Sequence, residues 1–592
     1  LAKRIARRIR ESGGGLPRVQ ANGFWIEELA CAQVSMNLLD FRVTPMWKVW
    51  EMVYEEAAAE GVELRESELI GLAPVAALLD VADHAGAPAD SPVETRLAVA
   101  ARFLKLRAFS PLQALELRLE AAEKAAAQAR EGNASLHAIA PIVRRARQPR
   151  VSLRIIRGGR TDAADGLMVV GASEVVTMAG GLRAGPAQAD PAILDASPGP
   201  GTAGGGRRER AVIAMWGERI VAIGTQEDVE RVLEAEGLSA GRFARLDAGG
   251  AVVTPGLIDP HTHLLFGGTR ENELVLRQGG ARYLEILAAG GGILSTVAAT
   301  RAASEEQLAN HGRRWLTEML AHGVTTIEAK SGYGLDLATE LRLVEVAFQL
   351  GRVGPIDVLP TYLGAHAVPA EFRARPDGKD AYVRAILEEQ LPGIAAQGRA
   401  RFCDVFCEEG VFDAADSRRI LTAADRLGML PRLHADELVP SGGAELAAEI
   451  GALSADHLGA ISDEGVEALA GAVAGPHPVV ATLLPVTTLF LMSGHYAPAR
   501  RLIDAGVPVA LGTDFNPGTS PTPNLPLAMA LGCLELGLSP AEALAAVTIN
   551  AAHAVGLGDE IGSLEPGKLA DLVIWRVPSM SQIPRVVYET SS

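Results

Sequence analysis

Residues 259–270, DPHTHLLFGGTR, place His261 and His263 one residue apart, directly after the apolar run AVVTPGLI. In an extended chain alternate side chains point to the same face, so both imidazoles can reach one object. For this pair alone, a polar strand end is the simpler interpretation, and half of a metal site is the alternative. The protein has only 12 histidines in 592 residues, so the positions of the others can decide between the two.

Further polar residues occur where later apolar runs end. His366, His434 and His457 occupy such positions, and Asp514 ends the run VPVALGTDF. A His-x-His pair, His434 and Asp514 suit zinc or ferrous iron, with a position left for water or substrate. Glu437, in HADE, and His457, in ADHL, are suited to moving protons around an activated water. Each histidine alone is better explained as a structural residue, but the set indicates a metal site.

These residues need a scaffold that brings strand ends together. Eight short apolar runs recur over residues 256–545, most of them separated by helix-like segments: PGLIDPHTH, VTTIEAKSG, IDVLPTYLGAH, RFCDVFCEEG, LPRLHADEL, LSADHL, VVATLLPVT and VPVALGTDF. Continuous apolar runs suit parallel strands that are buried on both faces. Eight βα units close a barrel whose active site forms where the strands end. The sequence therefore predicts an α/β fold, a (β/α)8 TIM barrel over 256–545.

The regions beside the barrel contain further short strands. GLMVVGASEVVTMA and AVIAMWGERIVAIG precede it and KLADLVIWRV follows it, which predicts a small flanking β domain built from residues 165–255 and 546–592. Within the first part, residues 183–211 are dominated by Gly, Pro and Ala. This composition has too little bulky apolar surface to offset the entropy of ordering, so we expect a disordered insertion there.

The front of the chain is a separate region. Residues 1–115 alternate apolar strands with amphipathic helices, and Val34, Met36 and Leu38 recur at period two. Residues 116–164 are rich in Ala and Arg and end in RGGRTDAADG, which predicts a linker. An α+β module is therefore expected to precede the barrel.

The composition excludes several classes of protein. The net charge is −17 and no sustained Lys/Arg field follows the first few residues, so we expect no nucleic-acid partner. Four cysteines are too few and scattered for a disulfide framework, and Cys403 and Cys407 are expected to be buried thiols. No apolar run is long enough to span a membrane, and the basic opening LAKRIARRIR lacks the apolar core of a secretory signal. A cytoplasmic enzyme is therefore expected.

The HxH pair, the later histidines and Asp514 resemble the amidohydrolase superfamily, in which a barrel holds a catalytic metal in this way. Two-metal members carry a carboxylated lysine at the end of the fourth strand, where this chain reads CEEG. Lys330 belongs to the second run, so we expect it to form an ion pair at the surface or behind the site. The resemblance implies one metal ion per chain, Zn²⁺ or Fe²⁺/Fe³⁺.

A finer resemblance, over about residues 165–585, is to the imidazolonepropionase family. It rests on DPHTHLLFGGTRENE, GGGILSTVAATRAASEEQL, EAKSGYGL, LGAHAVP, LHADEL, GGAELA, SADHLG and TDFNPGTSPT. The resemblance implies a hydrolase that acts on a carbon–nitrogen bond in a cyclic amide. Its small-molecule substrate would be 4-imidazolone-5-propanoate and its product N-formimino-L-glutamate, in histidine degradation. The resemblance is compatible with a homodimer.

The resemblance also implies roles for individual residues. The metal ligands would be His261, His263, His434 and Asp514. The substrate contacts would be Arg270 (on the propionate), Tyr333, His366, Glu437, Asn516, Gly518 and Thr519. The catalytic residues would be Glu437, His457 and Asp514. The chain departs from the family pattern at Val486, in LLPVTT, where the family commonly has glycine.

AQVSMNLLDFRVTPMWKVWE and ESELIGLAP resemble the C-terminal subdomain of glutamate formiminotransferase, over about residues 1–110. The resemblance implies a ferredoxin-like α+β module and admits tetrahydrofolate as its ligand. The family's catalytic histidine lies in an N-terminal subdomain that is not matched here. The only histidines before residue 250, His84 and His137, lack a catalytic context, so we expect no formiminotransferase activity from this chain alone.

Two alternatives remain open at the level of sequence. One is another mononuclear amidohydrolase, such as a purine or pyrimidine aminohydrolase, which would share the HxH pair, the later histidines and Asp514. The other is a non-catalytic folate-binding or scaffold fusion whose barrel has lost activity. The filled ligand positions count against the second alternative, and SGYG, GAHA and FNPGT count against the first.

Overall fold

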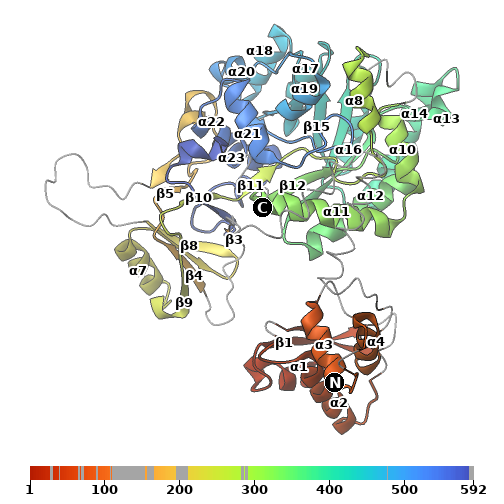
Figure 1. Ribbon diagram of the computed structural model, residues 1–592. Coiled ribbons are helices and arrows are strands. Elements are labelled where there is room, and N and C mark those ends of the chain that lie inside the picture. The colour runs from red at the N-terminus through yellow and green to blue at the C-terminus, as the bar shows by residue number, and fades with distance from the viewer. Residues whose placement is uncertain are drawn as a thin grey trace. The chain divides into compact units, whose positions relative to one another are not determined.

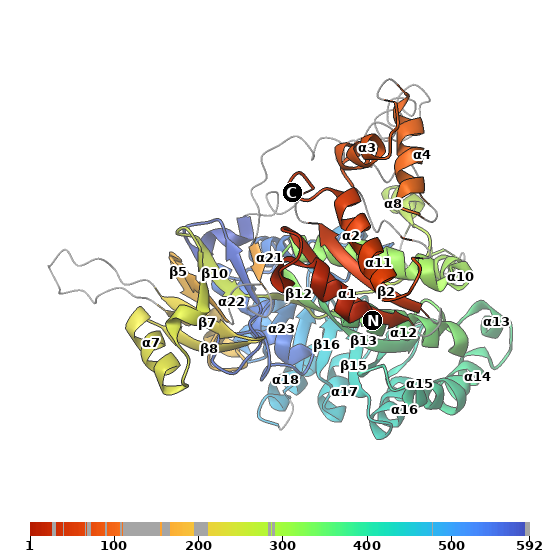
Figure 2. The same cartoon turned by 90° about the horizontal axis from the view of Figure 1, so that it is seen from below.

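The structure is a computed structural model in which the chain divides into two compact units, residues 1–150 and 151–592 (Figures 1 and 2). The described residues are 1–26, 31–38, 41–64, 67, 73–88, 91–106, 109, 154–156, 166–194, 211–281, 286, 291–475 and 478–585. Within these ranges no helix is both long and apolar enough to cross a membrane.

The first unit combines helices with a hairpin. Its elements are α1 (Ala2–Ile9), β1 (Val19–Ile26), β2 (Cys31–Leu38), α2 (Met46–Ala59), α3 (Val75–His84) and α4 (Val93–Phe103). The strands pair antiparallel, and α1 and α2 contribute Ile5, Ile9, Val49 and Val53 to one core with Val19 of β1. The unit is thus α+β, and its described part contains a two-stranded sheet rather than the larger sheet of a ferredoxin-like fold.

The second unit is built around an eight-stranded parallel sheet in sequential order. The strands are β11 (Leu257–Asp259), β12 (Val324–Lys330), β13 (Asp357–Ala365), β14 (Phe402–Cys407), β15 (Leu430–Ala435), β16 (Ser454–His457), β17 (Val480–Leu483) and β18 (Val509–Leu511). A parallel bridge between Thr262 and Phe515 joins the extended chain after β11 to that after β18. The predicted (β/α)8 barrel and α/β class are confirmed.

Helices cover the outside of the barrel strands (Figures 1 and 2). They are α8 (Glu271–Gln278), α10 (Ile293–Ala302), α11 (Glu305–Ala321), α12 (Leu337–Val353), α13 (Ala370–Arg373), α14 (Gly378–Ala385), α15 (Leu391–Gln397), α16 (Ala414–Arg426), α17 (Gly443–Ile450), α18 (Asp463–Ala472), α19 (Pro485–Leu491), α20 (Ala499–Asp504), α21 (Leu525–Leu534), α22 (Pro540–Ala546) and α23 (Ile549–Ala554). Their starts follow local chemistry: Ser304 and Gln307 form a capping box on α11, and Asp336 caps α12.

Two further sheets come from the regions on either side of the barrel strands. A five-stranded sheet has the order β3 (Arg154–Ile156), β19 (Leu572–Trp575), β10 (Val252–Pro255), β5 (Glu174–Val176) and β6 (Ile193–Leu194). A four-stranded sheet has the order β8 (Arg219–Gly224), β7 (Val212–Trp216), β4 (Gly166–Val170) and β9 (Phe243–Asp247), with α7 (Gln226–Ala235) packed against it.

The structure corrects three of the predicted boundaries. The predicted linker 116–164 contains β3, which pairs with β19; its other residues lie outside the described ones. The predicted disordered insertion 183–211 is wrong for 183–194, because Gln188 is fully buried and exchanges hydrogen bonds of 3.1 Å with the backbone of Val509. Residues 195–210 lie outside the described part. Helix α23, within the predicted flank 546–592, packs against barrel strands β17 and β18.

Candidate metal centre and active site

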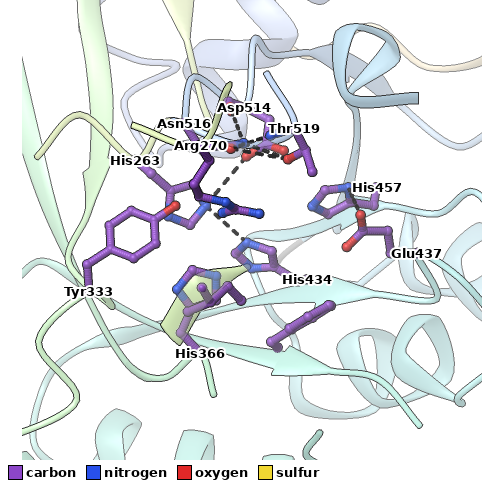
Figure 3. Close-up of a pocket in the computed structure, with 12 residues that line it drawn as sticks. His263, Arg270, Tyr333, His366, His434, Glu437, His457, Asp514, Asn516 and Thr519 are labelled. Carbon is purple, nitrogen blue, oxygen red and sulfur yellow. Dashed lines mark hydrogen bonds and ion pairs between the residues drawn. The ribbon is translucent and has the colours of Figure 1, made fainter. Parts of the chain in front are cut away.

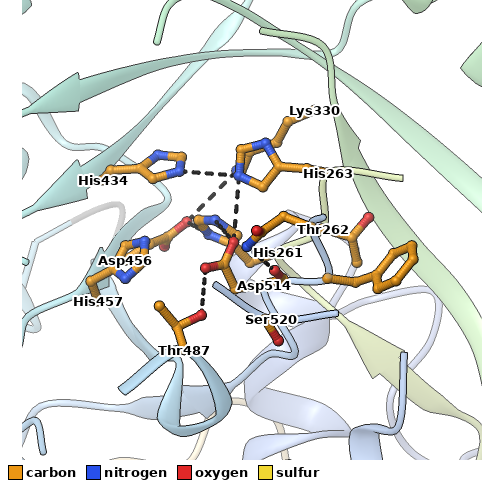
Figure 4. Close-up of polar contacts among 12 residues, drawn as sticks. His261, Thr262, His263, Lys330, His434, Asp456, His457, Thr487, Asp514 and Ser520 are labelled. Atoms are coloured by element: carbon orange, nitrogen blue, oxygen red, sulfur yellow. Dashed lines mark hydrogen bonds and ion pairs between the residues drawn. The ribbon is translucent and has the colours of Figure 1, made fainter. Parts of the chain in front are cut away.

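Four side chains from three places in the barrel lie close together at its mouth (Figure 4). His261 and His263 follow β11, His434 lies near the end of β15, and Asp514 follows β18. Asp514 Oδ1 lies 3.5 Å from His261 Nε2 and 3.4 Å from His263 Nε2. His263 Nε2 also lies 3.4 Å from His434 Nε2. The alternation of His261 and His263 turns both rings into the barrel mouth.

This donor set fits a tetrahedral metal ion. Ligand atoms about 2.1 Å from a tetrahedral zinc lie about 3.4 Å from one another. The three separations given above, between Asp514 and the two histidines of the pair and between His263 and His434, match this value. His261 Nε2 is buried and has no hydrogen-bond partner among the described residues, so a ligand at this point would satisfy it. Burial lowers the pKa of His261 and of His263 well below the usual range, which favours the neutral imidazoles that metals bind.

The donors are oriented by a further set of polar residues. His261 Nδ1 lies 2.7 Å from Asp456 Oδ2, and His434 Nδ1 lies 3.1 Å from the Asp404 carboxylate. A carboxylate on Nδ1 fixes the tautomer so that Nε2 is the ligating atom. Thr487 donates a 2.5 Å hydrogen bond to Asp514 Oδ2, which leaves Oδ1 facing the histidines.

Buried cations link these carboxylates beneath the site. Lys330 Nζ lies 2.7 Å from Asp404 Oδ2, 3.0 Å from Glu328 Oε1 and 3.8 Å from Asp456 Oδ2. Arg432 Nη2 donates to Asp456 Oδ2 at 3.1 Å. All of these side chains are fully buried, so of the two places expected for Lys330 the surface is wrong and the ion pair lies behind the site (Figure 4).

Glu437 and His457 lie near each other in the same pocket as His434 and Asp514. Glu437 Oε1 lies 3.8 Å from His457 Nδ1. Burial, followed by the charge of Asp514, raises the pKa of Glu437 well above its usual range. Burial, followed by repulsion from His434, lowers the pKa of His457 well below its usual range. These shifts favour the protonated form of the Glu437 carboxyl and the neutral form of the His457 imidazole, so one group could donate a proton and the other accept one.

Backbone strain accompanies this arrangement. His457 and Asp514 adopt left-handed conformations with φ of 76° and 51°. Such conformations cost non-glycine residues about 1–3 kcal/mol each and persist where the surroundings determine them. His457 and Asp514 are therefore held in place by the barrel rather than by local preference.

The pocket above the donors contains most of the predicted substrate contacts (Figure 3). It is lined by His263, Arg270, Ile293, Tyr333, His366, Phe406, His434, Glu437, His457, Asp514, Asn516 and Thr519. His261 lies behind it, fully buried, and Gly518 does not line it. The Asn516 side chain closes the 516–519 loop by accepting from the backbone N–H groups of Gly518 and Thr519, both at 2.8 Å.

Sequence reasoning missed the polar residues that support the site. Asp404, Asp456 and Arg432 were not identified, although each interrupts an apolar strand run, in FCDVFC, LSADHL and LPRLHA. A charge inside a buried strand requires a partner, which is the signal that could have found them. Thr487 lies next to Val486, the position already noted as a departure from the family pattern.

The barrel and the donor set define a metal-dependent hydrolase class, and the comparisons agree. Residues 252–591 match the model of the amidohydrolase family, more than half of the chain. The fold is similar to that of an adenosine deaminase from Xanthomonas campestris with bound zinc, at TM-score 0.50 and 20% identity over 72% of this chain and 90% of that one. The chain therefore belongs to the amidohydrolase family.

Closer relatives place it within that family. An imidazolonepropionase of a Geobacillus species is 52% identical over 377 residues, 62% of this chain and 85% of the relative. That of Symbiobacterium thermophilum is 49% identical over 420 residues, 71% of this chain and 92% of the relative. The chain is a member of the imidazolonepropionases.

The first unit has its own relationship. Residues 1–112 match the model of the formiminotransferase domain. The protein thus combines a formiminotransferase-type segment with an amidohydrolase barrel in one chain.

Proposed function

We propose that His261, His263, His434 and Asp514 bind one zinc or iron ion in a reaction that opens the ring of 4-imidazolone-5-propanoate. Membership of the imidazolonepropionases makes the protein a hydrolase of histidine degradation that acts on a cyclic amide to yield N-formimino-L-glutamate. The observation that carries the metal assignment is the close approach of these donors: Asp514 Oδ1 lies 3.4–3.5 Å from the Nε2 atoms of His261 and His263, and His434 Nε2 lies 3.4 Å from that of His263.

The residues around the donors would then share the proton transfers. When bound, zinc or iron supplies Lewis acidity, which polarises a carbonyl oxygen and makes water acidic near neutral pH. His457 accepts the proton of the water that attacks the ring carbonyl carbon. Glu437 donates its proton to the ring nitrogen as the carbon–nitrogen bond breaks. His457 and Glu437 lie 3.8 Å apart, beyond direct hydrogen bonding, so return of the proton from His457 to Glu437 through one bridging water would restore both groups.

Asp514 is the second candidate acceptor for the proton of water. Burial raises its pKa to about 6, so this carboxylate is more basic than an exposed aspartate. Its Oδ2 accepts from Thr487, whereas Oδ1 faces the histidines. We assign Asp514 both a ligand role and a catalytic role.

The remaining pocket residues would bind the substrate. We assign Arg270 to the propionate carboxylate, because a buried guanidinium can form paired charge-assisted hydrogen bonds. Tyr333 and His366 also line the pocket, with ring centroids 5.3 Å apart. Asn516 and Thr519, which line the pocket, would also contact the ligand, whereas Gly518, which does not line it, would act only through the shape of the 516–519 loop. Glu437 would contact the ring that it protonates.

The test is an assay of imidazolonepropionate loss in which the metal is removed and restored. We expect turnover to disappear with chelation and to return with about one zinc or iron per chain. His261→Ala should lower both metal content and turnover, whereas His495→Ala, at an exposed histidine, should change neither. Full turnover by metal-free protein would rule the assignment out.

The first unit supports a narrower proposal. Its match to the formiminotransferase domain suggests that it binds tetrahydrofolate without transferring the formimino group. The barrel's product carries that group, so a fusion of consecutive steps is a coherent interpretation. A cytoplasmic location and a homodimer also remain proposals.

A further inference from the structure

A buried carboxylate that contacts the pocket-lining Arg270 has a role in neither the metal centre nor the proton transfers. Glu273 lies in α8, three residues after Arg270 and four before Arg277, and all three side chains are at least nine-tenths buried. Its two oxygens accept from Arg270, Oε1 from Nε at 3.1 Å and Oε2 from Nη2 at 2.9 Å. Arg277 Nη1 lies 3.7 Å from Oε2. Glu273 therefore joins two guanidinium groups at the edge of the pocket.

The same carboxylate also connects three segments of chain. The backbone N–H of Gly292, directly before α10, donates to Glu273 Oε1 at 2.7 Å. The next residue, Ile293, lines the pocket. Arg277 in turn donates from Nη2 to the carbonyl of Gly518 at 3.1 Å, in the loop that carries Asn516 and Thr519. Displacing this carboxylate would disturb α8, the start of α10 and the 516–519 loop.

Gly518 packs closely against the guanidinium of Arg270. A Cβ at this position would lie 2.1 Å from Arg270 Cζ and 2.3 Å from its Nη2. The guanidinium is thus packed against backbone that only glycine allows. Because Glu273 is bound along one edge and Gly518 lies on another side, the direction of the guanidinium is fixed before any ligand arrives.

We propose that Glu273 is the positioning residue that gives the pocket its preference for a carboxylate substrate. It engages Nε and Nη2 of Arg270 side-on, so the end of the guanidinium points into the pocket that Arg270 lines (Figure 3). An arginine fork can bind a second carboxylate through its terminal nitrogens in this arrangement.

The inference rests on the proposed contact between Arg270 and the propionate, and the experiment separates the two claims. Steady-state kinetics would compare 4-imidazolone-5-propanoate with its neutral propanamide analogue, on wild-type protein, Arg270→Lys, Glu273→Gln and Glu271→Gln. Glu271 is exposed on the first turn of the same helix and serves as the matched control. Metal content is measured for every variant.

We expect Glu273→Gln to raise KM for the acid about 10- to 100-fold, the range of a charge-assisted hydrogen bond. Its KM for the propanamide, its kcat and its metal content should stay near the wild-type values, and Glu271→Gln should match wild type throughout. Glu273→Asp keeps the charge but shortens the side chain by one methylene group. It should therefore raise KM for the acid by a smaller factor than Glu273→Gln does. It replaces Glu273→Gln if that variant does not fold.

Two outcomes would overturn the role proposed for Glu273. Both can be distinguished from the outcome that would overturn the contact between Arg270 and the propionate. Equal increases in KM for acid and amide would mean that Glu273 only supports the fold. An unchanged preference for the acid in Glu273→Gln, with that preference lost in Arg270→Lys, would mean that Arg270 needs no positioning by Glu273. If wild-type protein itself does not prefer the acid, the contact between Arg270 and the propionate is wrong, and the inference falls with it.

Discussion

Among single residues, Lys330 is notable because its charged ammonium group lies inside the protein instead of in water. Its ammonium is fully buried, and its pKa is nevertheless raised, because Asp404 and Glu328 outweigh the effect of burial. Buried ion pairs contribute little net stability, since desolvation offsets their attraction. What Lys330 contributes is orientation: it holds Asp404, with Asp456 3.8 Å away, against the two imidazoles that those carboxylates contact.

This role makes a prediction at the residue scale. Lys330→Met keeps the length of the side chain but leaves buried carboxylates without their cation. We expect the free energy of unfolding to fall by about 3–5 kcal/mol. Metal affinity should weaken about 10- to 100-fold, because the ligand histidines lose their fixed carboxylates. Urea unfolding and metal titration of the apo-protein measure the two effects separately.

The matched control is Lys379→Met. Lys379 also contacts two carboxylates, Asp413 at 2.9 Å and Asp416 at 2.7 Å, but its side chain is 40% exposed. Exposed pairs of this kind contribute about 0–1 kcal/mol, and Lys379 is not a partner of the metal ligands. If Lys330→Met binds metal as tightly as Lys379→Met, the orienting role of Lys330 is wrong.

At the scale of elements, two loops at the mouth of the barrel are each organised by a buried carboxylate. Glu408, after β14, accepts from the backbone N–H groups of Glu437, Leu438 and Val439 at 2.9–3.1 Å. Glu340, in α12, accepts from Gly332, Gly334 and Leu335, and so encloses Tyr333. These loops are therefore fixed by side chains from neighbouring elements rather than by secondary structure of their own.

The Glu408 contacts predict that the position of the loop that carries Glu437 affects catalysis. Glu408→Gln replaces one acceptor oxygen by a donor, which would face the backbone N–H groups of the loop and displace Glu437. We expect kcat to fall about 10- to 100-fold, because a small misplacement of a catalytic group has effects of this size. Metal content should stay at the wild-type level, since His434 precedes the loop.

Glu409→Gln provides the control, because Glu409 is the adjacent residue and its side chain is exposed. It should show wild-type kcat and metal content. Loss of metal in Glu408→Gln would contradict the assignment of Glu408 to the loop, since it would place the defect at the metal ligands.

At the scale of the whole molecule, the two units have separate cores. Ile5, Ile9, Val49 and Val53 pack within the first unit, and the large barrel core lies entirely within the second. All of the proposed ligand, catalytic and substrate residues belong to the second unit. Chemistry and folding of the barrel are thus expected to be independent of the first unit.

Residues 151–592, produced alone, should therefore hydrolyse the substrate with kcat and KM within about twofold of the full chain. Calorimetry should detect binding of tetrahydrofolate to the full chain. When N-formimino-L-glutamate is also supplied, the full chain should transfer no formimino group to the folate. A barrel that is inactive without residues 1–150 would contradict the first expectation. Measurable transfer would contradict the second.

The sequence alone determined the fold class and the types of residue at the centre. Period and length of the apolar runs predicted parallel strands, and eight of them predicted a barrel. The HxH pair, His434 and Asp514 stand where their runs end, so the candidate ligands followed from local pattern. These properties depend on short-range spacing, which a single sequence displays directly.

Only the tertiary structure decided which polar residues support those ligands. Lys330 and Asp404 are 74 positions apart in the sequence. They meet because β12 and β14 both direct these side chains into the interior of the barrel. Glu273 likewise acquires its role from Arg270 beside it, from Gly292 before α10 and, through Arg277, from Gly518 after β18. Partners of this kind are selected by burial and by distance in space, and neither is encoded in the spacing of residues along the chain.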